Sequence, residues 1–189
     1  MLSLKTQQAM PFIKEEELEY LLPFMATAHA QLEEGSGPGA DFTGWYHVPG
    51  INTEEDLQRV EKVAARLRES SDIFLVLGIG GSYLGARAVI EACNHHFPTF
   101  LDKSQRGAPI VIFAGHQLSE DYLAELCDIL ENYDVSLNVV SKSGTTTETA
   151  IAFRILRSFM EQKYSPEELK QRIVVTTDAS KGALRSYAD

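Results

Sequence analysis

The sequence of 189 residues predicts an α/β fold in which a parallel β-sheet lies between two layers of helices, a three-layer αβα sandwich. Four short apolar runs are expected as buried strands, at residues 73–77, 109–114, 137–140 and 173–177. Segments with helical spacing of their apolar residues separate these runs, at residues 83–95, 118–132 and 146–163. Buried strands that alternate with helices are typical of a parallel sheet covered on both faces, and we expect the strand order 2-1-3-4-5.

Two further helices are expected ahead of this pattern. Residues 15–34 place apolar side chains on one side of a helix, and His29 falls on the same side, where we interpret it as a packed histidine. A glycine-rich joint and an irregular segment follow, and a second helix is expected over residues 53–69. We therefore divide the chain into a helical arm with an irregular segment, residues 1–52, and an α/β domain, residues 53–189.

Composition excludes several classes of function. The net charge is -10, and no basic stripe is present, which argues against nucleic acid or an anionic membrane as a partner. No apolar run is long enough to span a membrane, and residues 1–12 lack the features of a signal peptide, so a cytoplasmic location is expected. Cys93 and Cys127 lie on expected helix faces and are interpreted as buried free thiols. The sequence predicts no metal site and no cofactor.

The residues that carry most chemical information are Ser-Lys-Ser-Gly-Thr-Thr-Thr-Glu-Thr at positions 141–149, here called the cradle. They lie between an expected strand and an expected helix, whose first turn exposes unpaired N–H groups and the positive end of the helix dipole. Hydroxyl groups can donate further hydrogen bonds to phosphate oxygens, so this segment predicts a phosphate site. The alternative is a capping box, in which Thr145 caps the helix and Glu148 reaches back to it.

A glycine-rich loop, Gly-Ile-Gly-Gly-Ser-Tyr-Leu-Gly at positions 78–85, follows the first strand of the sheet. Its spacing does not fit the dinucleotide fingerprint because Tyr83 occupies the third glycine position. A flavin- or nucleotide-binding domain is therefore the less favoured interpretation. In the order 2-1-3-4-5 strands one and three are neighbours, so this loop and the cradle would face one small anion, whereas the order 3-2-1-4 would separate them.

The two motifs together resemble the glucose-6-phosphate isomerase family of bacterial type. The resemblance rests on Val76–Gly85 and Val140–Thr149, is supported by Asp41-Phe42-x-Gly44-Trp45 and Thr176-Thr177-Asp178, and covers nearly the whole chain. It implies the N-terminal part of such an enzyme, with a first sugar-isomerase (SIS) domain at residues 53–189 and a second SIS domain absent. It also implies a central five-stranded parallel sheet.

The resemblance further implies which residues hold the sugar phosphate. Gly81 and Ser82 in the glycine loop would line the sugar-phosphate site, and Ser141, Ser143 and Thr146 in the cradle would hydrogen-bond the phosphate directly. The backbone around Lys142, Gly144 and Thr145 would complete the phosphate site, with Thr149 at its edge. The side chain of Lys142 is not assigned a catalytic role.

No catalytic residue is expected within the chain. In the family the base, the acid and the group that stabilises the enediolate are implied to lie beyond the equivalent of Asp189. We therefore expect a chain that supplies the phosphate-binding part of a site for glucose 6-phosphate and fructose 6-phosphate but is inactive alone. The intact enzyme is expected to be a homodimer or a higher homo-oligomer. The alternative function is a stand-alone sugar-phosphate-sensing module.

Overall fold

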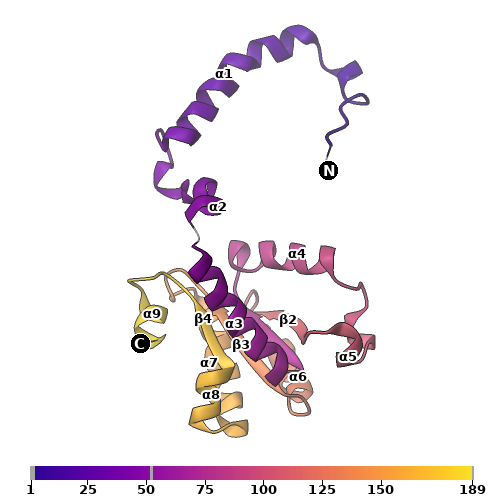
Figure 1. Ribbon diagram of the computed structural model, residues 1–189, viewed down its shortest axis with the longest axis vertical. Helices are drawn as coiled ribbons and strands as arrows, with labels where there is room; N and C mark the ends of the chain where they lie inside the picture. Colours follow the sequence, from indigo (N-terminus) through magenta and orange to yellow (C-terminus); the bar gives the residue numbers. More distant parts are fainter. Residues whose placement is uncertain (1–2, 52, 189) are drawn as a thin grey trace. The chain divides into compact units, whose positions relative to one another are not determined.

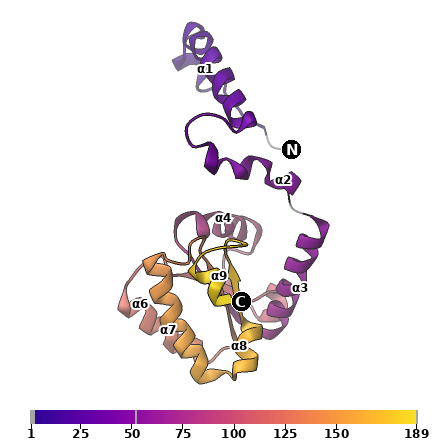
Figure 2. The ribbon, with the colours of Figure 1, turned by 90° about the vertical axis from the view of Figure 1, so that its left-hand side faces the viewer.

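The computed structural model describes residues 3–51 and 53–188. The chain forms two compact units, one up to Arg59 and one from Val60 onward (Figures 1 and 2). The boundary between them falls inside helix α3 (Glu54–Ser70). We describe each unit by itself.

The first unit is helical. Helix α1 (Glu15–Glu34) confirms the expected element and ends at Gly35, which adopts a left-handed conformation with φ of 63°. The segment expected to be irregular contains short helical turns instead, namely η2 (Ala40–Phe42), η3 (Gly44–His47) and α2 (Val48–Ile51). A further short turn, η1 (Met10–Phe12), precedes α1. The interpretation of His29 as a packed histidine is wrong, because its side chain is 64% exposed and lies 3.5 Å from the Glu33 carboxylate.

The second unit contains a sheet of four parallel strands in the order β2-β1-β3-β4. The strands are β1 (Ile73–Leu77), β2 (Ile110–Ala114), β3 (Val135–Val140) and β4 (Ile173–Thr176). This order agrees with the first four positions of the expected order 2-1-3-4-5. No fifth strand lies within residues 3–51 and 53–188, because the chain after β4 turns into helix α9 (Ala183–Ala188).

Helices cover both faces of this sheet, as Figure 2 shows for α3 on one side and α6 and α7 on the other. The long helices confirm the sequence prediction: α4 (Leu84–Cys93), α6 (Glu120–Leu130) and α7 (Thr147–Lys163). Shorter elements were not expected: η4 (Gly80–Ser82), η5 (Pro98–Phe100), α5 (Lys103–Arg106) and α8 (Pro166–Arg172). The apolar core lies between β1, β3, α6 and α7 and includes fully buried Leu75, Leu137 and Leu156.

The two cysteines are free, as expected, but they are not both buried. Cys127 is half-buried in α6, whereas Cys93 is exposed at the end of α4. The prediction of a buried thiol at Cys93 is therefore wrong. The physical reason is that none of the described residues of α4 is buried, so its apolar spacing does not mark a core face in this chain.

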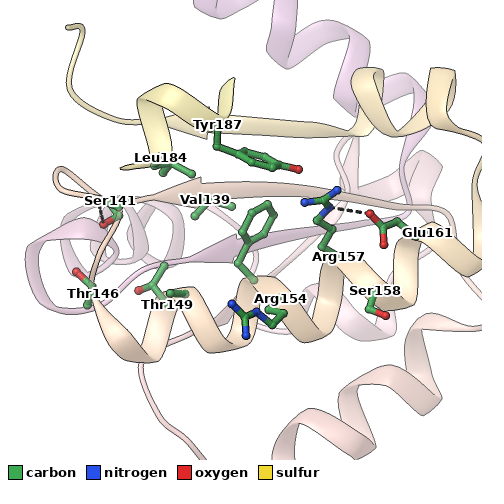
Figure 3. A pocket seen from close by; sticks show the side chains of 13 residues that line it. Val139, Ser141, Thr146, Thr149, Arg154, Arg157, Ser158, Glu161, Leu184 and Tyr187 are labelled. Atoms are coloured by element: carbon green, nitrogen blue, oxygen red, sulfur yellow. Dashed lines mark hydrogen bonds and ion pairs between the residues drawn. The ribbon is translucent and has the colours of Figure 1, made fainter. Parts of the chain in front are cut away.

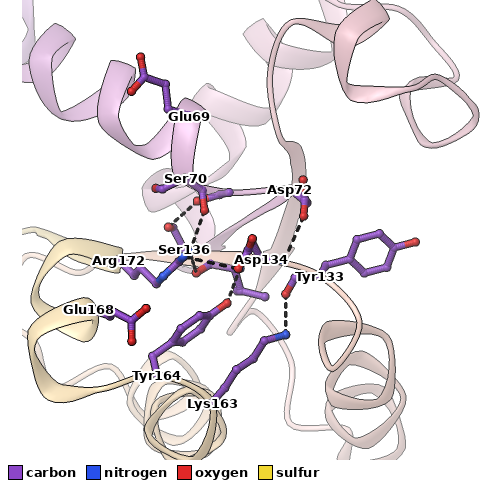
Figure 4. Close-up of polar contacts among 12 residues, drawn as sticks. Glu69, Ser70, Asp72, Tyr133, Asp134, Ser136, Lys163, Tyr164, Glu168 and Arg172 are labelled. Atoms are coloured by element: carbon purple, nitrogen blue, oxygen red, sulfur yellow. Dashed lines mark hydrogen bonds and ion pairs between the residues drawn. The ribbon is translucent and has the colours of Figure 1, made fainter.

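Polar side chains close the amino end of the sheet (Figure 4). The Tyr164 hydroxyl accepts a hydrogen bond of 2.8 Å from the Val135 N–H, the first N–H of β3. The Arg172 guanidinium lies 4.2 Å from the centre of the Tyr164 ring and donates to the carbonyls of Ser70 and Val135. The Lys163 ammonium donates to three carbonyls just after or at the end of α6, those of Leu130, Glu131 and Tyr133. These contacts bind α3, α6, α7 and α8 to the start of β3.

We predict that Tyr164→Phe lowers the free energy of unfolding by about 1–3 kcal/mol, because it leaves the buried Val135 N–H without an acceptor. Burial raises the pKa of Tyr164, in agreement with a hydroxyl held in a dry site. The measurement is urea denaturation followed by circular dichroism. The control is Tyr133→Phe, whose side chain is 44% exposed and which should change the midpoint little. Equal midpoints for Tyr164→Phe and the wild type would contradict the assignment.

A second prediction concerns Asp72, also at the amino end of the sheet. Partial burial acts to raise the pKa of this carboxyl, but the Asp134 N–H at 3.1 Å and the Lys103 ammonium at 3.3 Å outweigh it and hold the pKa below its usual value. A carboxyl with a lowered pKa in the folded state stabilises the fold at neutral pH, and this contribution is lost as the pH falls through the folded-state pKa.

The free energy of unfolding of the wild type should therefore fall as the pH is lowered below about 4, and Asp72→Asn should reduce this dependence. Urea denaturation at several pH values measures both. Glu69→Gln, at an exposed carboxyl of α3, serves as the matched control and should keep the wild-type acid dependence. If the two variants lose stability in parallel with acid, Asp72 is not the titrating group.

Candidate anion-binding site

The glycine loop and the cradle leave neighbouring strands at the same level of the sheet. Residue Leu77 at the end of β1 pairs with Val139 of β3, and the strands are parallel. This confirms the prediction that the loops after strands one and three lie side by side. The glycine loop turns tightly, since Gly80 has φ of 57° and a Cβ at Gly78 would lie 3.0 Å from the Ser82 Cβ.

The cradle turns back on itself through its own hydroxyl groups. Ser141 is 4% exposed, and its Oγ accepts a hydrogen bond of 3.0 Å from the Gly144 N–H. The Oγ of Ser143 accepts hydrogen bonds from the Thr145 N–H at 3.2 Å and from the Thr145 hydroxyl at 2.9 Å. The two serine hydroxyls therefore satisfy the loop amides that an anion would otherwise meet.

The first turn of α7 is left without a side-chain cap. Thr146 is the N-cap residue, and no described side chain accepts a capping hydrogen bond there. The capping-box alternative is wrong, because the helix begins one residue later than the box requires and Glu148 becomes its second residue. The reason is local: Gly144 has φ of 72°, and the bond from Thr145 to Ser143 keeps Thr145 outside the helix. The first-turn N–H groups thus remain free of side-chain caps.

Residues beyond β4 brace the cradle from outside. The Thr177 hydroxyl donates to the Ser141 carbonyl at 2.8 Å, and the Ala183 N–H donates to the Ser143 carbonyl at 3.1 Å. Between them, the carboxylate of Asp178 accepts from the N–H groups of Ser180 and Lys181, and the bond from Ser180 is the main cause that lowers the pKa of Asp178. This turn places the start of α9 directly against the cradle.

A cavity of about 500 Å³ opens between α7 and α9, next to the cradle (Figure 3). The hydroxyl-bearing residues Ser141, Thr146 and Thr149 lie at one end of the cavity, and Arg157 and Glu161 lie at the other. The Arg157 guanidinium donates a hydrogen bond of 2.8 Å to the Glu161 carboxylate. Aromatic rings line the middle, where Phe153 of α7 and Tyr187 of α9 meet edge to face with centres 5.6 Å apart.

The structure brings together only part of the residue set expected from sequence. Four of the predicted residues line this cavity, namely Ser141, Gly144, Thr146 and Thr149. Gly81, Ser82, Lys142, Ser143 and Thr145 are not among its lining residues. Lys142, Ser143, Thr145 and Gly81 are exposed, and Ser82 is half-buried at the end of η4.

Sequence reasoning missed the residues of α7 and α9 that complete the cavity. Phe153, Arg154 and Arg157 recur at helical spacing from Thr149 and Ala150, so their common face on α7 could have been read from the sequence. Leu184 and Tyr187 lie on a short helix whose position depends on contacts with the cradle. No sequence pattern in residues 177–188 predicts the contact between Leu184 and Gly144.

The described residues lack the features of two other kinds of site. No helix among them is both long and apolar enough to cross a membrane. Within the same residues, no group of three or more histidine, cysteine, aspartate or glutamate side chains is placed to hold a metal ion.

Comparison with known proteins identifies relatives over nearly the whole chain, although no model of a protein family matches it. The chain is 50% identical over 95% of its length to a glucose-6-phosphate isomerase of Clostridium tetani. It is 54% identical over 92% of its length to a glucose-6-phosphate isomerase of Symbiobacterium thermophilum. In structure it resembles a hypothetical protein from Thermus thermophilus, with a TM-score of 0.74, 26% identity and all of this chain covered.

The chain spans about 40% of the length of these curated relatives and 41% of the Thermus protein. Its sequence is thus homologous to the N-terminal part of glucose-6-phosphate isomerases, which confirms the resemblance recognised from the two motifs.

We predict that Gly144→Ala lowers the free energy of unfolding by about 2–5 kcal/mol. A Cβ at this position would overlap the Leu184 backbone nitrogen and lie 2.6 Å from the Leu184 Cβ, and φ of 72° is unfavourable for alanine. Urea denaturation gives the change. The matched control is Gly85→Ala in α4, where a Cβ meets nothing within 4 Å. This change should raise the free energy of unfolding slightly, because alanine favours a helix more than glycine does. Similar urea midpoints for Gly144→Ala and Gly85→Ala would show that α9 does not pack closely against the cradle.

Proposed function

We propose that this chain supplies the phosphate-binding part of the site of an aldose–ketose isomerase that interconverts glucose 6-phosphate and fructose 6-phosphate. The observation that carries the proposal is the uncapped first turn of α7, which begins in a run of hydroxyl residues beside a cavity. The names of the curated relatives supply the reaction and the substrates.

In this proposal the phosphate of the substrate lies at the N-terminus of α7. Its negative charge is stabilised by the first-turn N–H groups and by the positive end of the helix dipole. The hydroxyls of Ser141, Ser143 and Thr146 donate to the phosphate oxygens, and Thr149 stays at the edge because its hydroxyl donates to the Gly115 carbonyl at 3.3 Å. Gly81 and Ser82 complete the contacts around the sugar phosphate, and the backbone at Lys142, Gly144 and Thr145 completes the cradle that presents these hydroxyls.

The chemical step needs groups other than these. Isomerisation moves a proton between C2 and C1 through an enediol, which requires a base beside those carbons and stabilisation of the negative charge that develops. The carboxylate that lines the described cavity, Glu161, is paired with Arg157 at 2.8 Å and lies at the end of the cavity away from the cradle. We propose that the catalytic groups belong to the part of the longer enzyme that this chain does not match, so that this chain binds substrate without turning it over.

The proposed function extends to the domain organisation, the oligomeric state and the location of the intact enzyme. Residues 53–189 would be the first SIS-type domain and residues 1–52 a helical arm. The intact enzyme would be a homodimer or a higher homo-oligomer, located in the cytoplasm. The shared name of the relatives favours the isomerase over the stand-alone sensing module.

We predict that the chain binds glucose 6-phosphate but not glucose, measured by isothermal titration calorimetry. Ser141→Ala and Thr146→Val should each weaken binding about 10- to 100-fold, since each removes a hydrogen bond to a charged group. Thr99→Val, at an exposed threonine of η5, is the matched control and should bind like the wild type.

A coupled assay for fructose 6-phosphate should detect no turnover by this chain. Turnover of glucose 6-phosphate above background would overturn the assignment of the catalytic groups to the rest of the enzyme. Equal binding of glucose and glucose 6-phosphate would overturn the phosphate site itself.

A further inference from the structure

The last residue of β2 and the two residues after it contact the start of the glycine loop and the end of the cradle, and we call Ala114-Gly115-His116 the β2 clamp. The Ala114 carbonyl accepts a hydrogen bond of 3.1 Å from the Gly78 N–H, at the start of the glycine loop. Gly115 has φ of 74°, and a Cβ there would lie 3.3 Å from the Thr149 Cα and 3.5 Å from the Gly78 nitrogen. The clamp therefore touches both halves of the proposed site through its backbone.

The third residue of the clamp extends this contact through its side chain. The His116 ring stacks on the Tyr83 ring, with centres 5.2 Å apart and planes inclined by 22°. Its other neighbour is Tyr122, which meets it edge to face at 6.3 Å and is itself fixed by a hydrogen bond of 2.9 Å to the Phe113 carbonyl. His116 is thus held by α6 on one side and presents its face to Tyr83 on the other.

Tyr83 is the residue through which this contact can reach the ligand site. It is the N-cap residue of α4 and directly follows Gly81 and Ser82, and its N–H donates to the Gly80 carbonyl at 3.2 Å. A ring that fixes Tyr83 therefore fixes the end of the glycine loop that carries the predicted substrate contacts.

The ring acts by stacking rather than by hydrogen bonding. His116 Nδ1 is inaccessible to solvent and has no hydrogen-bond partner among the described residues. A buried nitrogen without a partner contributes no stabilising hydrogen bond, whereas stacked rings attract each other and exclude water. The contact should therefore tolerate a phenyl ring but not the loss of the ring.

We propose that His116 is a positioning residue, which holds Tyr83 and thereby sets Gly81 and Ser82 against the phosphate ester in the cradle. The inference rests on the proposed function for the identity of the ligand, but the placement of the glycine loop can be measured without any ligand. His116 itself does not touch the phosphate ester.

The first measurement is amide hydrogen exchange of the ligand-free chain, read at Ser82 and Tyr83, whose N–H groups donate within the glycine loop. His116→Ala should raise their exchange rates by about tenfold or more, while the amides of β1 and β3 stay protected and show that the variant is folded. His116→Phe should exchange like the wild type. Tyr83→Ala should reproduce the effect of His116→Ala, and His96→Ala, at an exposed histidine, is the matched control.

The second measurement is calorimetric titration of the same chains with glucose 6-phosphate and with inorganic phosphate. His116→Ala should weaken binding of glucose 6-phosphate about tenfold, and His116→Phe should stay within about twofold of the wild type. Wild-type exchange at Ser82 in His116→Ala, or equal losses in His116→Phe and His116→Ala, would overturn the proposal. If the wild type binds neither ligand while the exchange pattern holds, the proposed function fails and the positioning of the loop by His116 stands.

Discussion

The candidate site depends on one constraint, the parallel pairing of β1 with β3. Both strands are almost completely buried, with Leu75, Leu77, Val135 and Leu137 each 0% exposed, so a shift by one residue would turn apolar side chains out of the core. The register that this burial fixes brings Leu77 opposite Val139. The glycine loop begins one residue after Leu77 and the cradle two residues after Val139, and their proximity is therefore a consequence of core packing.

The two ends of the sheet use their polar groups in opposite ways. At the amino end, side chains of Tyr164, Arg172 and Lys163 bind backbone groups of other elements, and the hydrogen bonds tie helices to β3. At the carboxyl end, the hydroxyls of Ser141 and Ser143 bond within their own loop, and the N-terminus of α7 is left without a side-chain cap. A sheet with one end fixed by cross-links can leave uncapped amides at the other, where ligands bind in open parallel sheets.

The sequence predicted the elements whose signal is carried by many residues and missed those that depend on a single contact. The strands and α7 were found because apolar runs and a helical period extend over several residues. Helix α8 was missed although Ser165 and Glu168 form a capping box before it, a local signal that was available. The contact of Leu184 with Gly144 could not be predicted, because it joins α9 to the cradle, and only the folded sheet brings these two segments together. The position of His29 was misjudged because helical spacing alone does not show which side of a helix meets a core.

The hydrogen bonds of the cradle limit how a phosphate can bind there. The N–H groups of Gly144 and Thr145 already donate to the hydroxyls of Ser141 and Ser143, so an incoming anion competes with these bonds. The serine hydroxyls, in contrast, accept in these bonds, and their own protons can be donated outward. An anion that accepts from the hydroxyls and from the first turn of α7 leaves the loop intact, whereas one that takes the loop amides must first open it. Under the proposed function, the loop would therefore suit a ligand with several acceptor oxygens in different directions, as in a phosphate ester, rather than a planar carboxylate.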